Sequence, residues 1–318
     1  MLSKKSQKVS SVTDGMLETT LTEISLPNAT AIRVNEHDQN EVYRVTWKGN
    51  TYFLKLFSDV LADPDAGINE LEAIKILKGH GLPVPEVLHF YKGKPRNYAL
   101  YSALRGTSLM PQDVQSHTPQ CVDLLERLSK ITSQRFGYIH PNPEAFREYA
   151  SYEEYLNDVL RLALRRLNEE HNTRSMENLL GELFEKGRAK RDFVFCHNDL
   201  NPRHTFWEGG SLTGLIDFEW SFFGGPIVDA ASWVVALREM GARAEDIKPY
   251  LTYMIEKSQS QDVAKFYLAR RFLISASWPN KRLEKDVVKR EFVRLSRQII
   301  YAPTEEALEQ VFMKESDD

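Results

Sequence analysis

The stretch FCHNDLNPRHTFWEGGSLTGLIDFEW, residues Phe195–Trp220, alternates short apolar runs with polar turns. We predict strands at FVFC, which begins two residues earlier, at TFW and at LTGLID, with a polar turn at HNDLNPRH and a glycine-rich reversal at EGGS. The reversal returns the last strand beside TFW. Asp217, at the end of that strand, is therefore expected near the turn that carries Asp199 and His204.

The side chains of Asp199, His204 and Asp217 are of types that can jointly hold a substrate and a divalent cation. A carboxylate on a tight turn can accept a hydrogen bond from a substrate hydroxyl, and a neutral imidazole nitrogen can ligate a metal. Carboxylate oxygens suit Mg²⁺, which one or two protein ligands hold together with substrate phosphates. Two alternatives stay open: the His-x-Asp turn could be a local cap, and Asp217 with Glu219 could be a solvated strand end.

The composition excludes several classes of partner. Hydrophobic residues make up 42% and charged residues 27% of the 318 residues, which is ordinary globular usage. A net charge of −4 gives no electrostatic footprint for nucleic acid or an anionic membrane, so a small ligand is favoured. Two cysteines are too few for a disulfide framework. No apolar stretch approaches the length that spans a bilayer, and we expect a cytoplasmic protein with no obligate protein partner.

Periodicity divides the chain into two halves. Residues 31–57 read as three antiparallel strands, residues 68–81 as a helix that stops at two glycines, and residues 97–102 as a further strand. Amphipathic helices follow, in VDLLERLSKI, YEEYLNDVLRLALRRLNEE, VVALREM, IKPYLTYMIEK and DVAKFYLARRFLISA.

These elements predict an α+β fold of two lobes, which suits a chain too long for one comfortable core. The N-lobe, residues 1–101, would hold an antiparallel sheet and one main helix. Residues 102–106 would form a hinge. The C-lobe, residues 107–318, would be mostly helical and contain the small β hairpin.

Lys55 interrupts the apolar strand FLKLF, where a lysine is avoided unless it points into a cleft or lies on an exposed edge. The functional interpretation aims its ammonium at the phosphates of a nucleotide. Such a lysine needs a carboxylate to orient it, and Glu70 on the next helix is placed to provide one, with Glu72 as the second choice. The edge-strand interpretation stays open.

The order of these residues resembles the aminoglycoside phosphotransferase and choline kinase superfamily, whose fold is similar to that of eukaryotic protein kinases. The residues that carry the resemblance are Lys55, Glu70, His197-x-Asp199-x-x-x-x-His204 and Ile216-Asp217-Phe218-Glu219. The resemblance covers nearly the whole chain from Ala31 onward. Its two downstream motifs are specific, and the N-lobe match is weaker.

The resemblance implies a role for each matching residue. Asp199 would be the catalytic aspartate, Asp217 the magnesium ligand, and Lys55 the group that binds the α and β phosphates of ATP or GTP. The backbone from Ser102 to Leu104 would hydrogen-bond the nucleotide base. It also implies that His197 is a buried anchor and that Asp229, most simply a helix N-cap, braces the catalytic loop.

The chain departs from the family pattern at two places. Most members carry Asn where this chain has His204 as second metal ligand, although some aminoglycoside and macrolide kinases also carry His. The turn NEHDQNEVY, Asn35–Tyr43, has no glycine, which weakens a protein-kinase interpretation. Between Asp217 and Asp229 there is no length for a phosphorylatable activation segment, so the acceptor is expected to be a small molecule.

We therefore predict a small-molecule kinase that uses Mg²⁺ and transfers the γ-phosphoryl group to a hydroxyl of a polar, amine-bearing or polyhydroxylated substrate. An aminoglycoside-like acceptor is favoured, and a choline-type or ethanolamine-type amino alcohol is the alternative. Glu219 and Trp220 are the candidate substrate residues; acids on one helix, Glu153, Glu154 and Asp158, could serve a cation but fit a solvated face better. A metal-dependent hydrolase and a non-catalytic nucleotide-binding pseudokinase are the rivals from other classes.

Overall fold

The computed structural model describes residues 11–35, 40–58, 67–94, 96–139, 149–171, 174–186, 193–278 and 286–313. The chain divides into two units. The first contains the residues up to Gly67 together with Pro85–Ala103, and the second contains Ile68–Val84 together with the chain from Leu104 onward.

An antiparallel sheet of five strands forms the first unit, in the order β1-β2-β3-β5-β4. The bounds are β1 Thr30–Arg33, β2 Glu41–Trp47, β3 Asn50–Leu56, β4 Val87–Tyr91 and β5 Tyr98–Ser102. The predicted meander is confirmed. Lys48 (φ 48°) and Gly49 (φ 79°) join β2 to β3, and two positive φ angles are what a two-residue hairpin turn of the strand-matching hand requires.

One face of this sheet carries a helix that the sequence pattern did not indicate, α1 at Ser11–Glu23. Leu21 and Leu26 are buried against β2, β3 and β5, in a cluster that includes Val45, Leu54 and Leu100. The helix has little amphipathic contrast along its length, which explains why periodicity alone did not reveal it.

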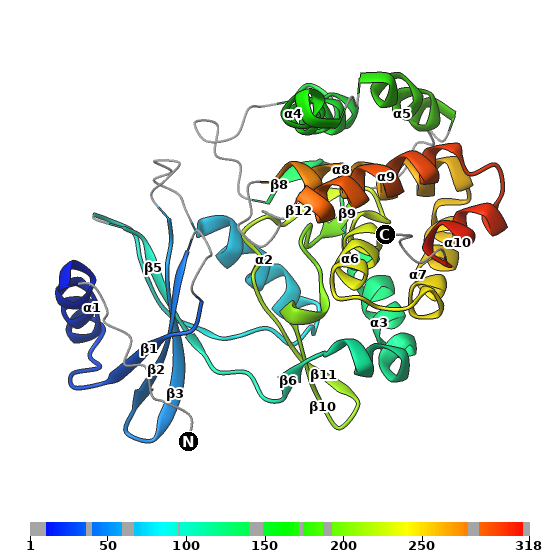
Figure 1. Cartoon of the computed structure of the whole chain (residues 1–318). Coiled ribbons are helices and arrows are strands. Elements are labelled where there is room, and N and C mark those ends of the chain that lie inside the picture. Colours follow the sequence, from blue (N-terminus) through cyan, green and yellow to red (C-terminus); the bar gives the residue numbers. More distant parts are fainter. Residues whose placement is uncertain are drawn as a thin grey trace, which may run out of the picture. The chain divides into compact units, whose positions relative to one another are not determined.

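Nine helices lie in the described part of the second unit: α2 Ile68–Gly79, α3 Val114–Ser129, α4 Tyr152–His171, α5 Arg174–Lys186, α6 Val228–Glu239, α7 Ala244–Ser258, α8 Gln261–Ser277, α9 Asp286–Tyr301 and α10 Glu305–Met313. α8 is the central element, since it packs against α4, α5, α6, α7 and α9. Figure 1 shows α8 and α9 side by side. Phe266, Leu268, Phe272 and Leu273 of α8 are all fully buried, so this helix offers a rigid support for any side chain that it directs at the site.

Helix α2 belongs to the second unit, and this differs from the expectation that residues 1–101 form one lobe with their helix. Asn69 at its start bonds the backbone of Glu219 and Ser221. After its end, Arg127 donates to Gly81 O, and Leu215 N donates to Pro83 O. Periodicity identified the helix correctly but could not show which core buries it.

Two small sheets complete the second unit. β9 (Phe193–Cys196) and β12 (Phe222–Gly224) are the inner strands of the order β7-β9-β12-β8, with β7 at Thr132–Ser133 and β8 at Gly137–Tyr138. β10 (Thr205–Glu208) pairs with β11 (Ser211–Leu215) and with β6 (Thr107–Ser108). Gly209 and Gly210 both have positive φ and make the reversal. The predicted hairpin is therefore confirmed.

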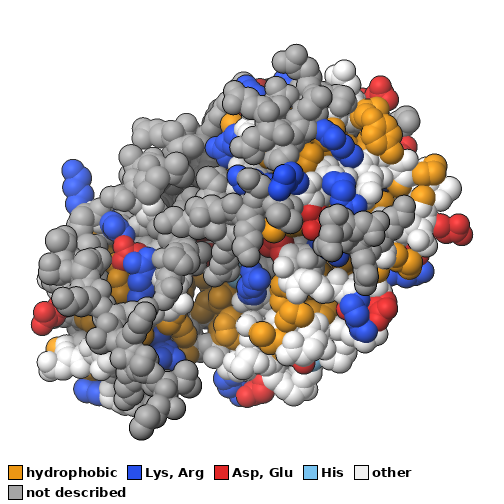
Figure 2. All heavy atoms as spheres, viewed as in Figure 1, with side chains coloured by type: hydrophobic (Ala, Val, Ile, Leu, Met, Phe, Trp, Pro, Cys, Tyr) orange, Lys and Arg blue, Asp and Glu red, His pale blue; other side chains and the backbone are white. Residues whose placement is uncertain are grey.

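Among the described residues, no helix combines the length and the apolar character that crossing a bilayer requires. On the face drawn in Figure 2, the described basic and acidic side chains are interspersed and do not form a patch of one sign.

Candidate active site

The turn after β9 is fixed to helix α6 by one carboxylate. Asp229 Oδ2 accepts from His197 N at 2.9 Å, and Asp229 Oδ1 accepts from Asn198 N at 2.8 Å. Asn198 lies in the left-handed region, at φ 66°, which asparagine tolerates better than most residues. The position of the N-cap of α6 is taken by Ile227, so the expectation that Asp229 caps the helix is wrong. Its carboxylate instead braces the loop.

His197 is a neutral structural anchor of this loop. Its side chain is fully buried, and Nε2 must carry the proton because it lies 2.9 Å from the carbonyl oxygen of Ile216, which can only accept. Burial lowers the pKa of His197 to about 4. Burial also raises the pKa of Asp229 to about 6, against the two N–H donors that lower it. A histidine in this state is no general base, which agrees with the anchoring role.

Asp199, His204 and Asp217 converge, as the hairpin predicted. Each offers a ligand atom, and these atoms lie within 4.8 Å of one another. His204 Nε2 lies 3.5 Å from Asp217 Oδ2, and His204 Nδ1 lies 3.7 Å from Asp199 Oδ2. The link that closes the hairpin, from Ile216 N to His204 O at 3.1 Å, brings Asp217 to this place.

One tautomer of His204 suits a metal ligand. Nδ1 lies 2.9 Å from the carbonyl oxygen of Asp199, which accepts, and 2.9 Å from Asn201 Nδ2, which donates. In the tautomer that carries the proton on Nδ1, this proton is donated to the Asp199 carbonyl. Nε2 then keeps its lone pair and faces Asp217. A metal-binding histidine characteristically donates its other ring N–H to a carbonyl or carboxylate in this way. Together with the carboxylate oxygens of Asp217, this donor set fits a divalent cation such as Mg²⁺.

Asp217 has a strained backbone conformation. Its φ is 70°, in the left-handed region that only a small share of non-glycine residues adopt. The next residue, Phe218, is completely buried, and this fixes the chain on the far side of the aspartate. Strain of this kind persists where the surrounding packing enforces it and is concentrated at functional sites. It turns the carboxylate of Asp217 out of the strand direction and toward His204.

Glu70 lies close to this group from another part of the sequence. Its carboxylate is buried and comes within 4.8 Å of ligand atoms of Asp217 and Glu219. Asn69 fixes the approach, because its Nδ2 donates to Glu219 O and Ser221 O, each at 2.9 Å. The second choice, Glu72, pairs with Lys75 at 2.6 Å on its own helix. Glu70 is therefore the acid of this helix that the fold directs at the site.

Lys55 lies in the first unit, on β3, which is a central strand between β2 and β5. The interpretation of Lys55 as an edge-strand residue is therefore wrong. Its side chain is buried, and Nζ lies 5.4 Å from the ring centroid of Phe57. A buried lysine needs a role that repays its desolvation. Its pairing with Glu70 stays a prediction.

The expected nucleotide contacts of the backbone are described only in part. Ser102 N donates to Glu86 O and Ser102 Oγ accepts from Glu86 N, both at 2.9 Å, so the Ser102 N–H is engaged within the sheet. Leu104 packs tightly on Gly214, where an added Cβ would lie 2.3 Å from Leu104 Cδ1. In the phosphate-covering turn Asn35–Tyr43, residues 36–39 lie outside the described residues.

The acids expected on α4 have local roles. Glu154 accepts from Ala150 N at 2.8 Å beside the start of the helix, and Asp158 accepts from Tyr149 Oη at 3.1 Å. Trp220 instead faces another aromatic side chain: its ring lies 5.9 Å from that of Trp278 at 85°, and Trp278 is 39% exposed.

Sequence reasoning missed one residue that touches the site, Arg271 of α8. Its Nη2 donates to Asp199 Oδ1 at 2.9 Å, and its Nη1 donates to Asn198 O at 3.0 Å. The available signal was the pair of arginines inside the apolar run LARRFL, since charged residues are rarely buried without a partner. The neighbouring Arg270 turns the other way and lies over the ring of Tyr155.

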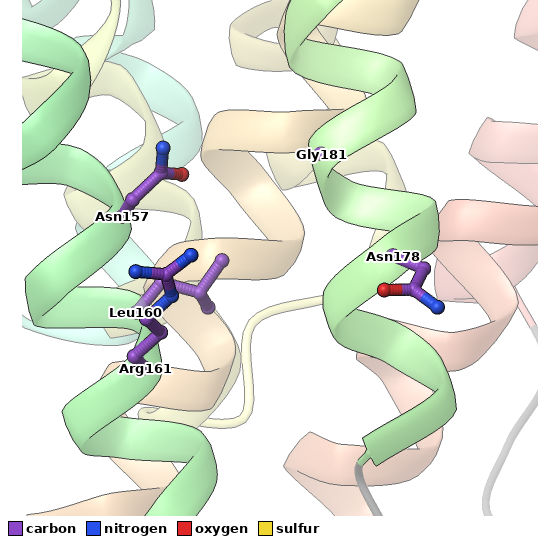
Figure 3. A pocket seen from close by; sticks show the side chains of 5 residues that line it. All are labelled: Asn157, Leu160, Arg161, Asn178 and Gly181. Atoms are coloured by element: carbon purple, nitrogen blue, oxygen red, sulfur yellow. The ribbon is translucent and has the colours of Figure 1, made fainter.

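A separate hollow of about 290 Å³ lies between α4 and α5 (Figure 3). Asn157, Leu160 and Arg161 come from α4, and Asn178 and Gly181 come from α5. It is open to solvent and shares no residue with the group around Asp199.

Solved structures of small-molecule kinases resemble this chain. A thermostable mutant of aminoglycoside phosphotransferase APH(4)-Ia, in ternary complex with ADP and hygromycin B, matches with a TM-score of 0.64 and 15% identity over 94% of this chain and 99% of that one. A choline/ethanolamine kinase family protein from Mesorhizobium loti gives 0.63 and 14% over 94% and 99%. Choline kinase LicA from Streptococcus pneumoniae gives 0.62 and 15% over 91% and 99%.

These likenesses confirm the predicted protein-kinase-like fold. Comparison with the curated proteins gives no match. A model of the phosphotransferase enzyme family, APH, matches residues 31–266, which is most of the chain and includes every residue of the site except Arg271 and Trp278. The chain therefore belongs to the phosphotransferase enzyme family.

Proposed function

We propose that this protein transfers the γ-phosphoryl group of a nucleoside triphosphate to a hydroxyl group of a small, polyhydroxylated molecule. The observation that carries the proposal is the convergence of Asp199, His204 and Asp217, with the imidazole of His204 between two carboxylates. Membership of a phosphotransferase family supplies the reaction class.

Each residue would contribute to positioning and charge balance, which dominate catalysis of phosphoryl transfer. Asp199 would hold the acceptor hydroxyl and take its proton late in the transfer. His204 Nε2 and Asp217 would hold Mg²⁺. When bound, this ion neutralises the charge of the phosphate oxygens. Lys55 would bind the α and β phosphates, and Glu70 would orient it.

The donor is proposed to be ATP or GTP. Support for a nucleotide comes from the APH(4)-Ia structure, whose ternary complex contains ADP. The base is proposed to contact the backbone from Ser102 to Leu104. We propose a cytoplasmic location, where both nucleotides are available.

The acceptor is proposed to be aminoglycoside-like in its array of hydroxyl groups. Hygromycin B is the second ligand in the APH(4)-Ia complex, which supports a polyhydroxylated acceptor. Two structures of choline or choline/ethanolamine kinases are equally similar, so an amino alcohol is the competing class. Glu219 and Trp220 are proposed to contact either acceptor, the tryptophan through its ring face.

The two rivals make different predictions. A metal-dependent hydrolase would use His197, Asp199, His204 and Asp217 as ligands. His197, however, is fully buried with Nε2 on the carbonyl oxygen of Ile216, and the hydrolase gives no role to the buried Lys55 and Glu70. A non-catalytic nucleotide-binding protein would have no use for Asp199 in a solvent-accessible position, with 40% of its side chain exposed.

The experiment is isothermal titration of the purified protein with ATP and with GTP, each with and without Mg²⁺. Product detection by mass spectrometry against a panel of hydroxylated amines and sugars follows. We expect Mg²⁺-dependent nucleotide binding and phosphorylation of at least one panel member, and neither a product nor ADP release with Asp199→Asn. The matched control is Asp123→Asn, an exposed aspartate on α3. Metal binding with no nucleotide binding would favour the hydrolase.

A further inference from the structure

Arg271 grips the loop that carries the proposed catalytic aspartate through both terminal nitrogens of its guanidinium. Nη2 donates to Asp199 Oδ1 at 2.9 Å and Nη1 donates to Asn198 O at 3.0 Å. The Arg271 side chain is 20% exposed, so the ion pair is partly shielded from solvent. Because the guanidinium group is planar and bonds two consecutive residues, it fixes the orientation of the Asp199 carboxylate as well as its distance.

The support behind Arg271 is rigid. Its neighbours on α8, Arg270 and Phe272, are buried, and the helix is packed on several sides. Nε of Arg271 is buried and has no hydrogen-bond partner among the described residues, so the group is held through its two ends at the loop. A buried nitrogen without a hydrogen-bond partner costs free energy of folding, which indicates that the contact of Arg271 with Asp199 has a function.

The contacts of Arg271 differ from those that Asp229 of α6 makes with the same loop. Asp229 already holds the loop backbone through the N–H groups of His197 and Asn198. Arg271 acts on the side chain of Asp199, because it occupies Oδ1. The other oxygen, Oδ2, lies 3.7 Å from His204 Nδ1, which is beyond hydrogen-bond distance. The Arg271 guanidinium therefore leaves Oδ2 as the oxygen of Asp199 that can accept a hydrogen bond from an acceptor hydroxyl.

We propose that Arg271 is a positioning residue for phosphoryl transfer, and that it selects against acceptors with a cationic nitrogen close to the reacting hydroxyl. The proposal rests on the proposed function. It chooses between the two acceptor classes of that function, in favour of a hydroxyl flanked by neutral groups.

The selection follows from charge. A hydroxyl that bonds Asp199 Oδ2 lies beside the guanidinium that holds Oδ1 of the same carboxylate. In choline and ethanolamine the nitrogen is only two carbons from the hydroxyl, so a second cation would approach the first. Arg271 also neutralises Asp199, which would otherwise attract ammonium groups. In a polyhydroxylated acceptor the amines can lie on carbons remote from the reacting hydroxyl.

The first test compares the ATP turnover of Arg271→Gln and Arg271→Lys with that of the wild type. The acceptor is either water or the panel compound that the wild type phosphorylates. We expect kcat to fall about 100-fold in the glutamine variant, as for a misplaced reacting group. KM for ATP and the calorimetric Kd for Mg²⁺-AMP-PNP should stay within about two-fold, since Arg271 bonds Asp199 and Asn198 and neither is proposed to hold the nucleotide. Lysine can satisfy one of these two acceptors and should restore part of kcat.

The control is Arg135→Gln, which removes an exposed arginine in the turn between β7 and β8 of the same unit. A parallel loss of nucleotide affinity and thermal stability in Arg271→Gln would reduce Arg271 to a folding role. Unchanged kcat in that variant would also overturn the proposal. No nucleotide binding or turnover by the wild type would instead reject the proposed function.

The second test titrates choline into wild type and Arg271→Gln, each saturated with Mg²⁺-AMP-PNP. We expect the glutamine variant to bind choline at least 10-fold more tightly, because Asp199 is no longer neutralised. Equal affinity, or no choline binding by either protein, would refute the proposal that Arg271 selects against such acceptors, since removing Arg271 would then not improve choline binding.

Discussion

Asp229 and His197 are in contact, and folding shifts their pKa values in opposite directions. These shifts predict how the stability of the protein changes as the pH falls. The Asp229 carboxylate accepts from the His197 backbone N–H. Burial raises the pKa of Asp229 from its ordinary 3.8 to about 6 and lowers the pKa of His197 from 6.5 to about 4. Both groups therefore change their proton occupancy between folded and unfolded states in nearly the same pH range.

The signs of the two contributions are opposite. Asp229 binds its proton more tightly when folded, so its contribution is present below pH 3.8 and is lost as the pH rises through about 6. His197 binds its proton less tightly when folded, so its contribution is present above pH 6.5 and is lost as the pH falls through about 4. Each corresponds to about 3 kcal/mol, at about 1.4 kcal/mol for each pH unit. Together they nearly cancel.

Asp229→Asn separates the two contributions. We expect the stability difference, wild type minus variant, to grow by about 3 kcal/mol as the pH falls from 7 to 4, because the variant keeps only the histidine contribution. Urea unfolding at several pH values measures it, with the fluorescence of Trp233, buried one turn along α6, as one probe. Contributions of all other carboxylates are common to both proteins and cancel in the difference.

Two further proteins complete the design. Asp123→Asn, on the exposed face of α3, is the matched Asp-to-Asn substitution outside the buried pair. His197→Gln should show the mirror image, in which the difference shrinks by about 3 kcal/mol on acidification. A pH-independent difference between wild type and Asp229→Asn from pH 7 to 4 would refute the reasoning, because it would mean that the buried carboxylate has an ordinary pKa.

Three further predictions concern the site and the fold. Asp217→Asn should weaken Mg²⁺-dependent ATP binding at least 10-fold and leave metal-free binding unchanged in calorimetry; equal loss in both would argue against a metal ligand. Lys55→Ala should weaken nucleotide binding more than Asp199→Ala does, and equal Kd values in the two variants would contradict the phosphate-binding role. Gly106→Ala should destabilise the fold by roughly 2–4 kcal/mol in urea unfolding, because φ is +81° and the added Cβ would lie 2.2 Å from Trp207 O; a loss under about 0.5 kcal/mol would show that the backbone relaxes freely.

The local structure around the site could be predicted because its signals are short-range. EGGS between two apolar runs specifies a hairpin, and Gly209 and Gly210 supply the two positive φ angles that it needs. Once the hairpin is given, its register alone returns Asp217 to His204. Lys48 and Gly49 supply the same pair of positive φ angles between β2 and β3.

Other elements escaped prediction for physical reasons. α1 lacks a strong apolar stripe, so its burial against the first sheet leaves little trace in the sequence. α3 begins at Val114, eight residues before the predicted run. The prediction began too late because a proline such as Pro119 usually interrupts a helix. α2 was found by periodicity, but the core that buries it was not.

The sequence by itself determined the reaction class, through residue types and spacings confined to ten or twenty positions around Asp199 and Asp217. Only the tertiary structure decided what surrounds those groups. Asp229 became a brace and not a cap, since its partners lie more than thirty residues away. Arg271 reached Asp199 across 72 positions. Contacts of this range depend on how helices pack, and helix packing is set by shape and burial that no periodicity in one chain segment encodes.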